Sequence, residues 1–412
     1  MATFEVELDI PGVKITKVEI DKNGNLTITV ESEVEGTHCH KCGKEITKFH
    51  GHDQKITLRH LSILGRKTYI CICPKRYQCT NCSGNPTSTQ SLSWYDLKSS
   101  QTKEYENHVL LQLINSTIID VSIKESLGEK AILGIVNRYI DTKINWREIK
   151  RLDVIGIDEI SLKKGHKDFV TIVTARIGVK VIILAVLKDR KKETVKEFFL
   201  SITNELRKTV KVICSDMYDG FINAAKEVFG KRVRIVADRF HVAKLYRNCL
   251  DSLRKIEMKR LKKELPEEKY KALTGLMWIL RKDTKKLTEE EKVTLKLLFG
   301  YSPLLELAYN FRNHLTDIFE EDISKEKAKR KIKSWMKKVE RSELTCFDKF
   351  LTTLENRMNE ITNYFHDRHS SGFVEGMNNK IKVIKRRCYG ILKPKSLFQR
   401  IHLDLTGYLK YA

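Results

Sequence analysis

Three acidic residues occupy positions from which one site can be built. Asp158 follows the apolar run "VIGI", Asp216 follows the apolar run "VKVIC" and one serine, and Glu375 lies in "SSGFVEGMNNKIKVIKRR", whose apolar spacing predicts a helix. Carboxylates that converge at strand ends suit Mg²⁺ or Mn²⁺, and two such ions can activate a water or a 3′-hydroxyl for attack on a phosphodiester. The three residues are therefore candidate catalytic residues and candidate magnesium ligands.

Two C-x-x-C pairs form a second candidate site. Cys39 with Cys42 and Cys79 with Cys82 lie in sequence that alternates apolar and polar residues, as strands do. Four thiolates satisfy a tetrahedral Zn²⁺ ion, and a small β module without much core depends on such an ion. Buried free cysteines are the alternative, but chance seldom pairs cysteines twice at ligand spacing. The pattern predicts a zinc site.

Polar residues accompany Glu375 along its helix. Phe373, Met377, Ile381 and Ile384 trace one apolar stripe, which predicts the buried face. The opposite face is expected to present Glu375 together with four candidate DNA contacts: Asn378, Asn379, Lys382 and Arg386.

Residues 101 to 145 predict three short helices, with Gly128 at the break before the third. This spacing is typical of a helix-turn-helix. In the third helix Leu133, Val136 and Ile140 are expected to be buried. Lys130, Asn137 and Arg138 then remain as candidate DNA contacts. Many amphipathic helices look alike, so the adjacent zinc module and the basic chain support this hypothesis.

The elements that must position the carboxylates follow from the same periodicity. Strands are predicted near 152–158, 169–176, 181–187, 211–215 and 233–237, with helices near 192–207 and 220–229. Three meandering strands followed by β-α alternation predict an α/β fold with a mixed sheet covered by helices. Residues 242 to about 366 read as helical throughout.

The overall charge points to a polyanionic partner. The 412-residue chain has 77 Lys and Arg against 53 Asp and Glu, a net charge of +24. Lysine and arginine neutralise phosphates and release counterions, so nucleic acid is the expected partner. We find no signal peptide and no apolar run of about 18 residues, which argues against a membrane protein and favours the cytoplasm.

Three blocks carry a family resemblance: "GIDEISLKKGH", "SDMYDGFINAAKEVFGKRVRIVADRFHV" and "SSGFVEGMNNKIKVIKRRCYGI". They resemble the ISL-three family of bacterial insertion-sequence transposases. The resemblance implies an RNase H-like core with a DDE triad of Asp158, Asp216 and Glu375, interrupted by a long all-α insertion. It also implies binding to terminal inverted repeats and to target DNA, Mg²⁺-dependent cleavage and strand transfer, a homo-oligomer on DNA and a nucleoid-associated prokaryotic location.

The implied division of the chain has five parts. They are a zinc-ribbon-like module (1–92), a helix-turn-helix (93–150), the first part of the catalytic core (151–241), the all-α insertion (242–368) and the final helices of the core (369–412).

Several neighbours of the triad need separate interpretation. Asp238 and His241 resemble an aspartate-histidine element of Mutator-like transposases and are possible accessory residues, although a helix cap with an ordinary histidine explains them equally well. Glu159 is expected to point away from Asp158 and to pair with a lysine. Two rival functions stay open: a catalytically inactive, transposase-derived DNA-binding regulator, and an RNase H-like nuclease or resolvase.

Overall fold

The structure is a computed structural model that describes residues 7–163, 167–342, 344–368 and 372–412. Residues 164–166 of the first resemblance block and 370–371 of the third therefore lie outside the described residues. The chain divides into two compact units, Met1–Asp141 with Gln399–Ala412 and Thr142–Phe398. None of the helices in the described ranges is both long and apolar enough to cross a membrane.

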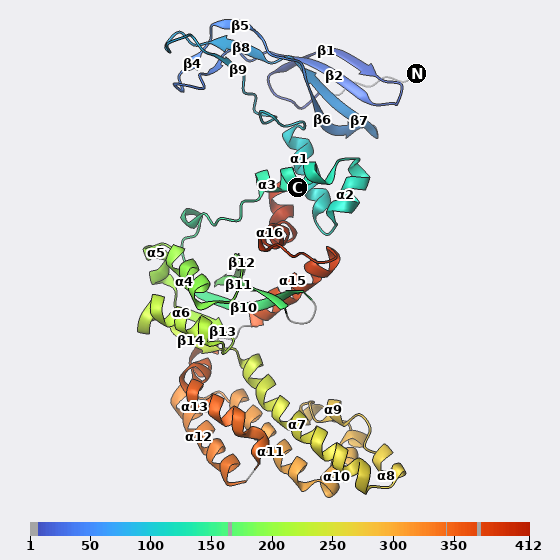
Figure 1. Cartoon of the computed structure of the whole chain (residues 1–412), viewed down its shortest axis with the longest axis vertical. Helices are drawn as coiled ribbons and strands as arrows, with labels where there is room; N and C mark the ends of the chain where they lie inside the picture. The colour runs from blue at the N-terminus through green and yellow to red at the C-terminus, as the bar shows by residue number, and fades with distance from the viewer. Residues whose placement is uncertain (1–6, 164–166, 343, 369–371) are drawn as a thin grey trace. The chain divides into compact units, whose positions relative to one another are not determined.

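The N-terminal part of the first unit is made of strands (Figure 1). A four-stranded sheet has the order β1-β2-β7-β6, a three-stranded sheet the order β5-β8-β9, and β3 pairs with β4. The bounds are β1 Val13–Ile20, β2 Leu26–Ser32, β3 Thr37–His38, β4 Glu45–Ile46, β5 Phe49–His52, β6 Ile56–Ile63, β7 Arg66–Ile72, β8 Lys75–Gln78 and β9 Thr87–Thr89.

This β-rich part has two separate small cores. One lies on the four-stranded sheet and contains Ile28, Val30, Leu58, Ile70 and Trp94 among its buried side chains. The other surrounds the cysteines and holds little besides them, namely Ile46 and Tyr77. A core this small gives little hydrophobic stabilisation, which is the situation in which a structural metal is needed.

The three predicted helices are present in the same unit, as α1 Lys103–Leu113, α2 Ile118–Glu125 and α3 Glu129–Tyr139. Thr117 and Asp120 form a capping box that starts α2, and Gly128 precedes α3. The last part of α16 (Pro394–Tyr411) packs here too, since Leu403 joins the core of the three helices and Gly407 lies against Ile114. This differs from the expected assignment of 369–412 to the catalytic core.

The second unit contains a five-stranded mixed sheet with the order β12-β11-β10-β13-β14. The β10, β11 and β12 strands form an antiparallel meander, whereas β13 and β14 run parallel to β10. The predicted order of elements is confirmed, except that the helix near 192–207 is two helices. The bounds are β10 Val154–Lys163, β11 Lys167–Ile177, β12 Lys180–Leu187, α4 Lys192–Ser201, α5 Asn204–Thr209, β13 Val212–Ser215, α6 Asp219–Phe229 and β14 Arg234–Ala237.

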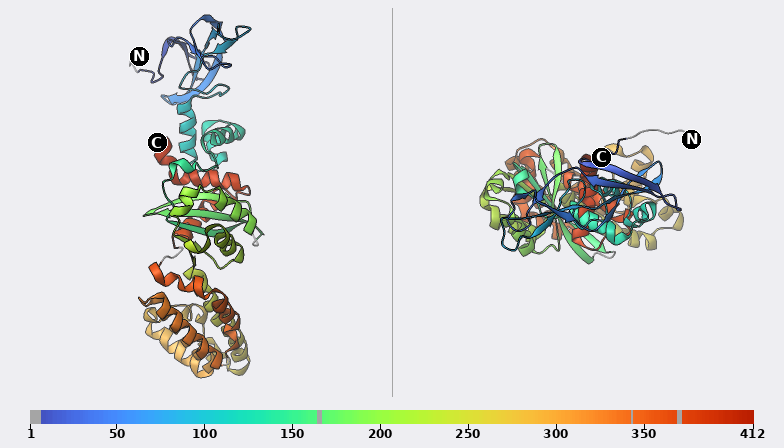
Figure 2. Two further views of the ribbon diagram at one scale, coloured as in Figure 1. Left: turned by 90° about the vertical axis from the view of Figure 1, so that its left-hand side faces the viewer. Right: turned by 90° about the horizontal axis from the view of Figure 1, so that it is seen from above.

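Alternate residues of the sheet face different helices. Ile155, Ile157 and Ile213 pack with residues of α4 and α6 such as Phe199 and Phe221. Gly156, on the opposite side of β10, lies under α15 (Gly372–Arg387). The sheet therefore has α4 and α6 on one face and α15 on the other (Figure 2).

Between β14 and α15 the described chain is helical, as predicted. These helices enclose a core around Trp335 that continues to Val212 and Cys214 of the sheet. The bounds are α7 Arg239–Glu264, α8 Glu267–Lys271, α9 Leu276–Ile279, α10 Glu289–Tyr301, α11 Pro303–Glu320, α12 Lys325–Arg341, α13 Asp348–Thr362 and α14 Tyr364–Asp367.

Candidate active site and metal centre

Three carboxylates follow one row of paired residues across the sheet. Ile157 of β10 pairs with Ser215 of β13, and Ser215 pairs with Ala237 of β14. The next residue on each strand is acidic: Asp158, Asp216 and Asp238. Because side chains alternate along strands and the pairing is in register, the three project toward the same face, the one that α15 covers. Parallel pairing thus brings together residues that are far apart in the sequence.

The sequence predicted that the strand would end at Asp158, but it does not. β10 continues to Lys163, because its antiparallel pairing with β11 extends from Val154 to Lys163. What ends at Ile157 is the pairing with β13. Asp158 therefore lies at the point where β10 loses one neighbour, on a rigid strand rather than at a free tip.

Burial raises the pKa values of both central carboxyls above their ordinary value of 3.8. For Asp158, the backbone N–H of Glu159, which donates to Oδ1 at 2.7 Å, and the imidazole of His241 act against this rise. For Asp216, burial raises the pKa to about 6, although the N–H of Tyr218 donates to its Oδ1 at 3.0 Å. The charge of Asp158 raises the pKa of Asp216 further. Two partly buried carboxylates that repel each other form a site that a cation stabilises.

Helix α15 approaches β10 very closely. A Cβ atom on Gly156 would lie 2.7 Å from Thr174 Oγ1, 3.0 Å from Phe373 Cε2 and closer still to Val374 Cγ2. Further along, Lys385 Nζ donates to the carbonyl oxygens of Ser161 at 2.6 Å and Leu162 at 3.2 Å. The absence of a side chain at Gly156 and the Lys385 bonds fix this helix along the strand.

The Asn378 side chain lies in the interface between α15 and β10. The prediction that it lies on the exposed face of the helix, as a DNA contact, was wrong. Its Nδ2 donates to Asp158 Oδ2 at 2.5 Å, and the residue is 3% exposed. The buried face of α15 consists of Val374, Asn378, Ile381 and Ile384. Ile381 and Ile384 are buried as predicted, whereas Val374 and Asn378 take the places expected for Phe373 and Met377, because Asp158 offers the buried amide a partner. Asn378 is therefore not available for surface contact with DNA. The other predicted contacts, Asn379, Lys382 and Arg386, are exposed.

Glu375 lies on α15 one turn before Asn378 and is partly buried. Residues three apart on a helix are neighbours on one face. The hydrogen bond from Asn378 to Asp158 consequently places the Glu375 turn of the helix beside the strand that carries Asp158.

Asp238 caps α7, accepting from the N–H of Phe240 at 2.9 Å, while its own N–H donates to the carbonyl of Ser215 at 2.8 Å. It is 7% exposed. Its charge and that of His241 both act on Asp158, so the two lie beside the central carboxylates. The cap is thus present, at the edge of the candidate site.

Glu159 points away from Asp158, as predicted, but its partner is an arginine. Arg190 Nη1 donates to Glu159 Oε2 at 2.9 Å. Arg190 lies in the connection between β12 and α4. No pattern in the sequence singled out this residue, or Lys385.

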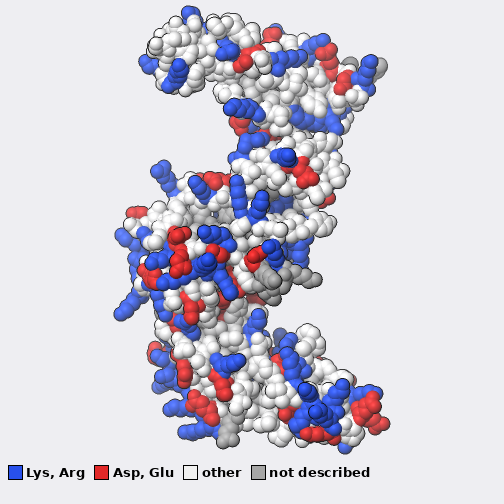
Figure 3. Space-filling model, in the orientation of Figure 1, with Lys and Arg blue, Asp and Glu red and all other residues white. Residues whose placement is uncertain are grey.

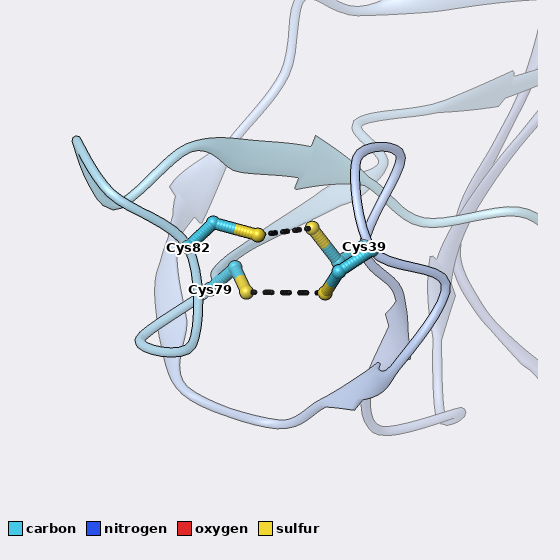
Figure 4. Close-up of side chains that lie close together, drawn as sticks. Cys39, Cys79 and Cys82 are labelled. Atoms are coloured by element: carbon cyan, nitrogen blue, oxygen red, sulfur yellow. Dashed lines mark hydrogen bonds between the residues drawn. The ribbon is translucent and has the colours of Figure 1, made fainter.

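The four predicted zinc ligands come together. Cys39 and Cys42 lie between β3 and β4, and Cys79 and Cys82 between β8 and β9. Their Sγ atoms lie within 4.8 Å of one another, with Cys39 to Cys82 at 4.0 Å and Cys42 to Cys79 at 3.8 Å (Figure 4). Zinc–sulfur bonds of about 2.3 Å in a tetrahedron require sulfurs about 3.8 Å apart. The cluster is therefore compatible with zinc.

Helix α3 presents the polar residues that were expected, with two differences. Lys130, Asn137 and Arg138 are exposed. Leu133 is 39% exposed rather than buried, and Ile132 and Ile135 lie in the core in its place. Arg138 pairs with the buried carboxylate of Glu106, and Asn137 Oδ1 accepts from Gln399 at 3.0 Å. Lys130 is the least engaged of the three among the contacts that the structure describes.

A model of the ISL3 family of DDE transposases, described as "Transposase", matches residues 155–401, more than half of the chain. The chain belongs to the ISL3 transposase family. It is also 23% identical to the transposase for insertion sequence element IS1001 of Bordetella parapertussis, over 96% of this chain and 95% of that protein. The transposase for insertion sequence element IS1557 of Mycobacterium tuberculosis is 22% identical, over 90% of this chain and 86% of that one.

The family match fits the position of the candidate site in this transposase. The matched residues 155–401 contain β10, β13 and α15, the elements that carry Asp158, Asp216 and Glu375. The similarity to the IS1001 transposase extends over nearly the whole chain, so it also includes the cysteine cluster and α1 to α3.

Proposed function

We propose that this transposase binds the terminal inverted repeats of its element, cleaves the DNA at the element ends and joins the 3′ ends to a target. The observation that carries the proposal is the row of partly buried carboxylates that follows the Ile157–Ser215 pair, with the Glu375 helix bonded to it through Asn378. The strand order, with an antiparallel meander beside two parallel strands, is that expected of an RNase H-like core.

Asp158, Asp216 and Glu375 are the proposed ligands of Mg²⁺ or Mn²⁺. The donor set fits, since it consists of hard carboxylate oxygens, two of which have pKa values raised by burial in the absence of a cation. When bound, two such ions supply Lewis acidity to both the attacking and the leaving oxygen of the phosphodiester.

The protein's own residues prepare this site. Asn378 fixes the rotation of the Asp158 carboxylate through Oδ2, while the N–H of Glu159 holds Oδ1. Asp216 is held by the N–H of Tyr218. Carboxylates held in this way need little reorganisation when ligands arrive, which favours the reaction. No protein nucleophile is needed, because water or a 3′-hydroxyl attacks phosphorus directly.

For the architecture we propose the division expected from the sequence, except that residues 399–412 belong to the first unit. A zinc-ribbon-like module and the helix-turn-helix recognise the ends, and the helices from α7 to α14 form an all-α insertion within the core. Support for the zinc part comes from the sulfur spacing and the small core around the cysteines. Lys130, Asn137 and Arg138 of α3 remain the proposed base or phosphate contacts, of which Arg138 also bonds Glu106.

The DNA partner is supported by charge as well as by family. Figure 3 shows Lys and Arg side chains distributed over the visible face, with Asp and Glu between them. Dispersed positive charge favours contacts to many phosphates along a duplex. We further propose an oligomer on DNA, because two element ends must be held together for joining.

The experiment that tests the proposal incubates the protein with pre-cut element ends, a target plasmid and Mg²⁺. Joined products support a transposase. End binding without cleavage would instead indicate a regulator, and cleavage of branched DNA without joining would indicate a nuclease or resolvase. Wild type must join the ends for the proposal to stand.

A further inference from the structure

A hollow with more lining cations than carboxylates lies near the candidate active site, because Tyr218, two residues after Asp216, lines it. It has a volume of about 560 Å³. Its lining consists of the rings of Phe169 and Tyr218, the exposed cations Lys163, Lys188, Arg190 and Lys191, the carboxylates Asp168 and Asp189, and apolar residues that include Leu392. This volume falls in the range of sites that hold small ligands, which includes one nucleotide.

Three contacts orient Arg190 in the lining of this hollow. Its guanidinium carbon lies 4.9 Å from the centre of the Phe169 ring and 5.1 Å from that of Tyr218, while Nη1 bonds Glu159 Oε2 at 2.9 Å. Cation–π contacts and an ion pair together fix the plane of the group. The side chain is nevertheless 44% exposed, so a charged and oriented group faces solvent.

The position of Arg190 relative to the carboxylates makes it useful for substrate binding. Tyr218, whose ring Arg190 contacts, donates its backbone N–H to Asp216. Glu159, its ion-pair partner, directly follows Asp158. An arginine that only balanced Glu159 would not need two aromatic rings or an exposed edge. A guanidinium has five N–H donors, and Glu159 is the acceptor that the described part of the chain records for it.

The surrounding charge favours an anion. Of the four lining cations, Lys163 pairs with Asp168, and Asp189 accepts from the backbone N–H of Lys191. Arg190 pairs with Glu159, and the charges of Lys188 and Lys191 act on Asp189, so the lining of four cations and two carboxylates keeps an excess of positive charge at the beginning of the connection that follows β12. A phosphate near these cations gains charge-assisted hydrogen bonds, and an arginine can bind two of its oxygens at once.

We infer that this hollow binds one nucleotide of the DNA strand adjoining the scissile phosphate, with Arg190 as the ligand of its phosphate. The inference rests on the proposed function, because it needs DNA to cross the Asp158 and Asp216 edge. The strand approaches a strongly acidic centre, and a fixed cation on its border offsets the repulsion between phosphates and carboxylates. Arg190 then sets where along the strand the DNA is cut.

The test combines Arg190→Gln with DNA ends that carry a single neutral methylphosphonate at successive positions. In wild type, neutralising the contacted phosphate should lower joining about 10-fold or more. In Arg190→Gln the joining rate should fall for every DNA end. A methylphosphonate at the contacted position should then cause no additional loss, because the variant already lacks the contact. The variant should also lower the salt dependence of DNA binding by about one phosphate contact.

Controls separate this role from a structural one. Lys180→Gln, at the far end of β12 and exposed, should keep the wild-type methylphosphonate profile. Arg190→Lys retains the charge, and should partly restore the sensitivity that Arg190→Gln loses. If Arg190→Gln and wild type show the same profile while both join ends, the inference is overturned and the proposed function stands. If wild type joins no ends, the proposed function fails, and this inference fails with it.

Discussion

The side-chain amide of Asn378 donates a hydrogen bond to Oδ2 of Asp158 at 2.5 Å, across the contact between α15 and β10. These residues are 220 positions apart in the sequence, with the helical segment between them. The bond joins the helix that carries Glu375 to the strand that carries Asp158. It makes the arrangement of the proposed metal ligands depend on one buried amide.

Removing this amide should impair the site without unfolding it. Asn378→Ala is expected to lower strand transfer about 10- to 100-fold and to raise the Mg²⁺ concentration needed for half-maximal rate, as loss of a partner of a metal ligand typically does. A titration of joining rate against Mg²⁺ measures both effects. Lys380→Gln, exposed on the same helix, is the control and should titrate like wild type. An Asn378→Ala protein with unchanged rate and metal dependence would show that the bond does not position Asp158.

The close approach at Gly156 gives a second prediction. Gly156→Ala should destabilise the second unit by about 1–3 kcal/mol, because the new Cβ overlaps Val374 and Thr174 and forces α15 away from β10. Gly376→Ala is matched to it, since nothing lies within 4 Å of a Cβ there, and alanine should stabilise the helix by about 0.5–1 kcal/mol. Urea unfolding of both variants measures the difference. Equal stability of the two variants would contradict the described packing.

The raised pKa of Asp216 predicts how stability depends on pH. The folded protein binds the proton more tightly than the unfolded chain, so this stabilising contribution is complete below about pH 4 and is lost as the pH rises through about 6. In metal-free buffer Asp216→Asn, which stays neutral, should therefore be more stable than wild type at pH 8, by up to about 3 kcal/mol, and about equal at pH 4. Chemical unfolding at both values measures this.

Added Mg²⁺ should reverse that order. At pH 8 the ion stabilises wild type by binding the folded state, and stabilises Asp216→Asn less because one ligand is missing. A variant that is no more stable than wild type at pH 8 without metal would mean that Asp216 is not destabilised by its surroundings.

The sequence alone predicted features that depend on neighbouring residues, but not those that depend on tertiary contacts. Local patterns predicted the strands, the three helices and the cysteine pairs correctly, because periodicity and ligand spacing are properties of neighbouring residues. Asn378 was predicted on the exposed face of its helix but is buried, since only the tertiary contact with Asp158 explains a buried amide. The extent of β10 past Asp158 depends on its pairing with β11, and Arg190 drew no attention because its ring partners lie on β11 and before α6.

Zinc removal should affect the first unit alone. Cys79→Ser is expected to lose the bound zinc, to unfold the segment around the small cysteine core and to weaken end binding by at least 10-fold, because that segment has little else to stabilise it. Cys73→Ser, an exposed cysteine of the same β-rich part, should keep one zinc per chain. Elemental analysis and gel-shift measurements with element ends provide the readouts. Full end affinity in the zinc-free Cys79→Ser protein would exclude zinc from recognition.

The most direct test of the central claim is the strand-transfer rate of Asp158→Asn, Asp216→Asn and Glu375→Gln, measured with pre-cut ends and Mg²⁺ beside their end-binding affinity. If the three carboxylates form one metal site, each variant should lose joining by at least about 1000-fold while binding ends like wild type. A variant that joins ends at close to the wild-type rate would show that its residue is not a ligand of the metal site, and would contradict the proposed triad.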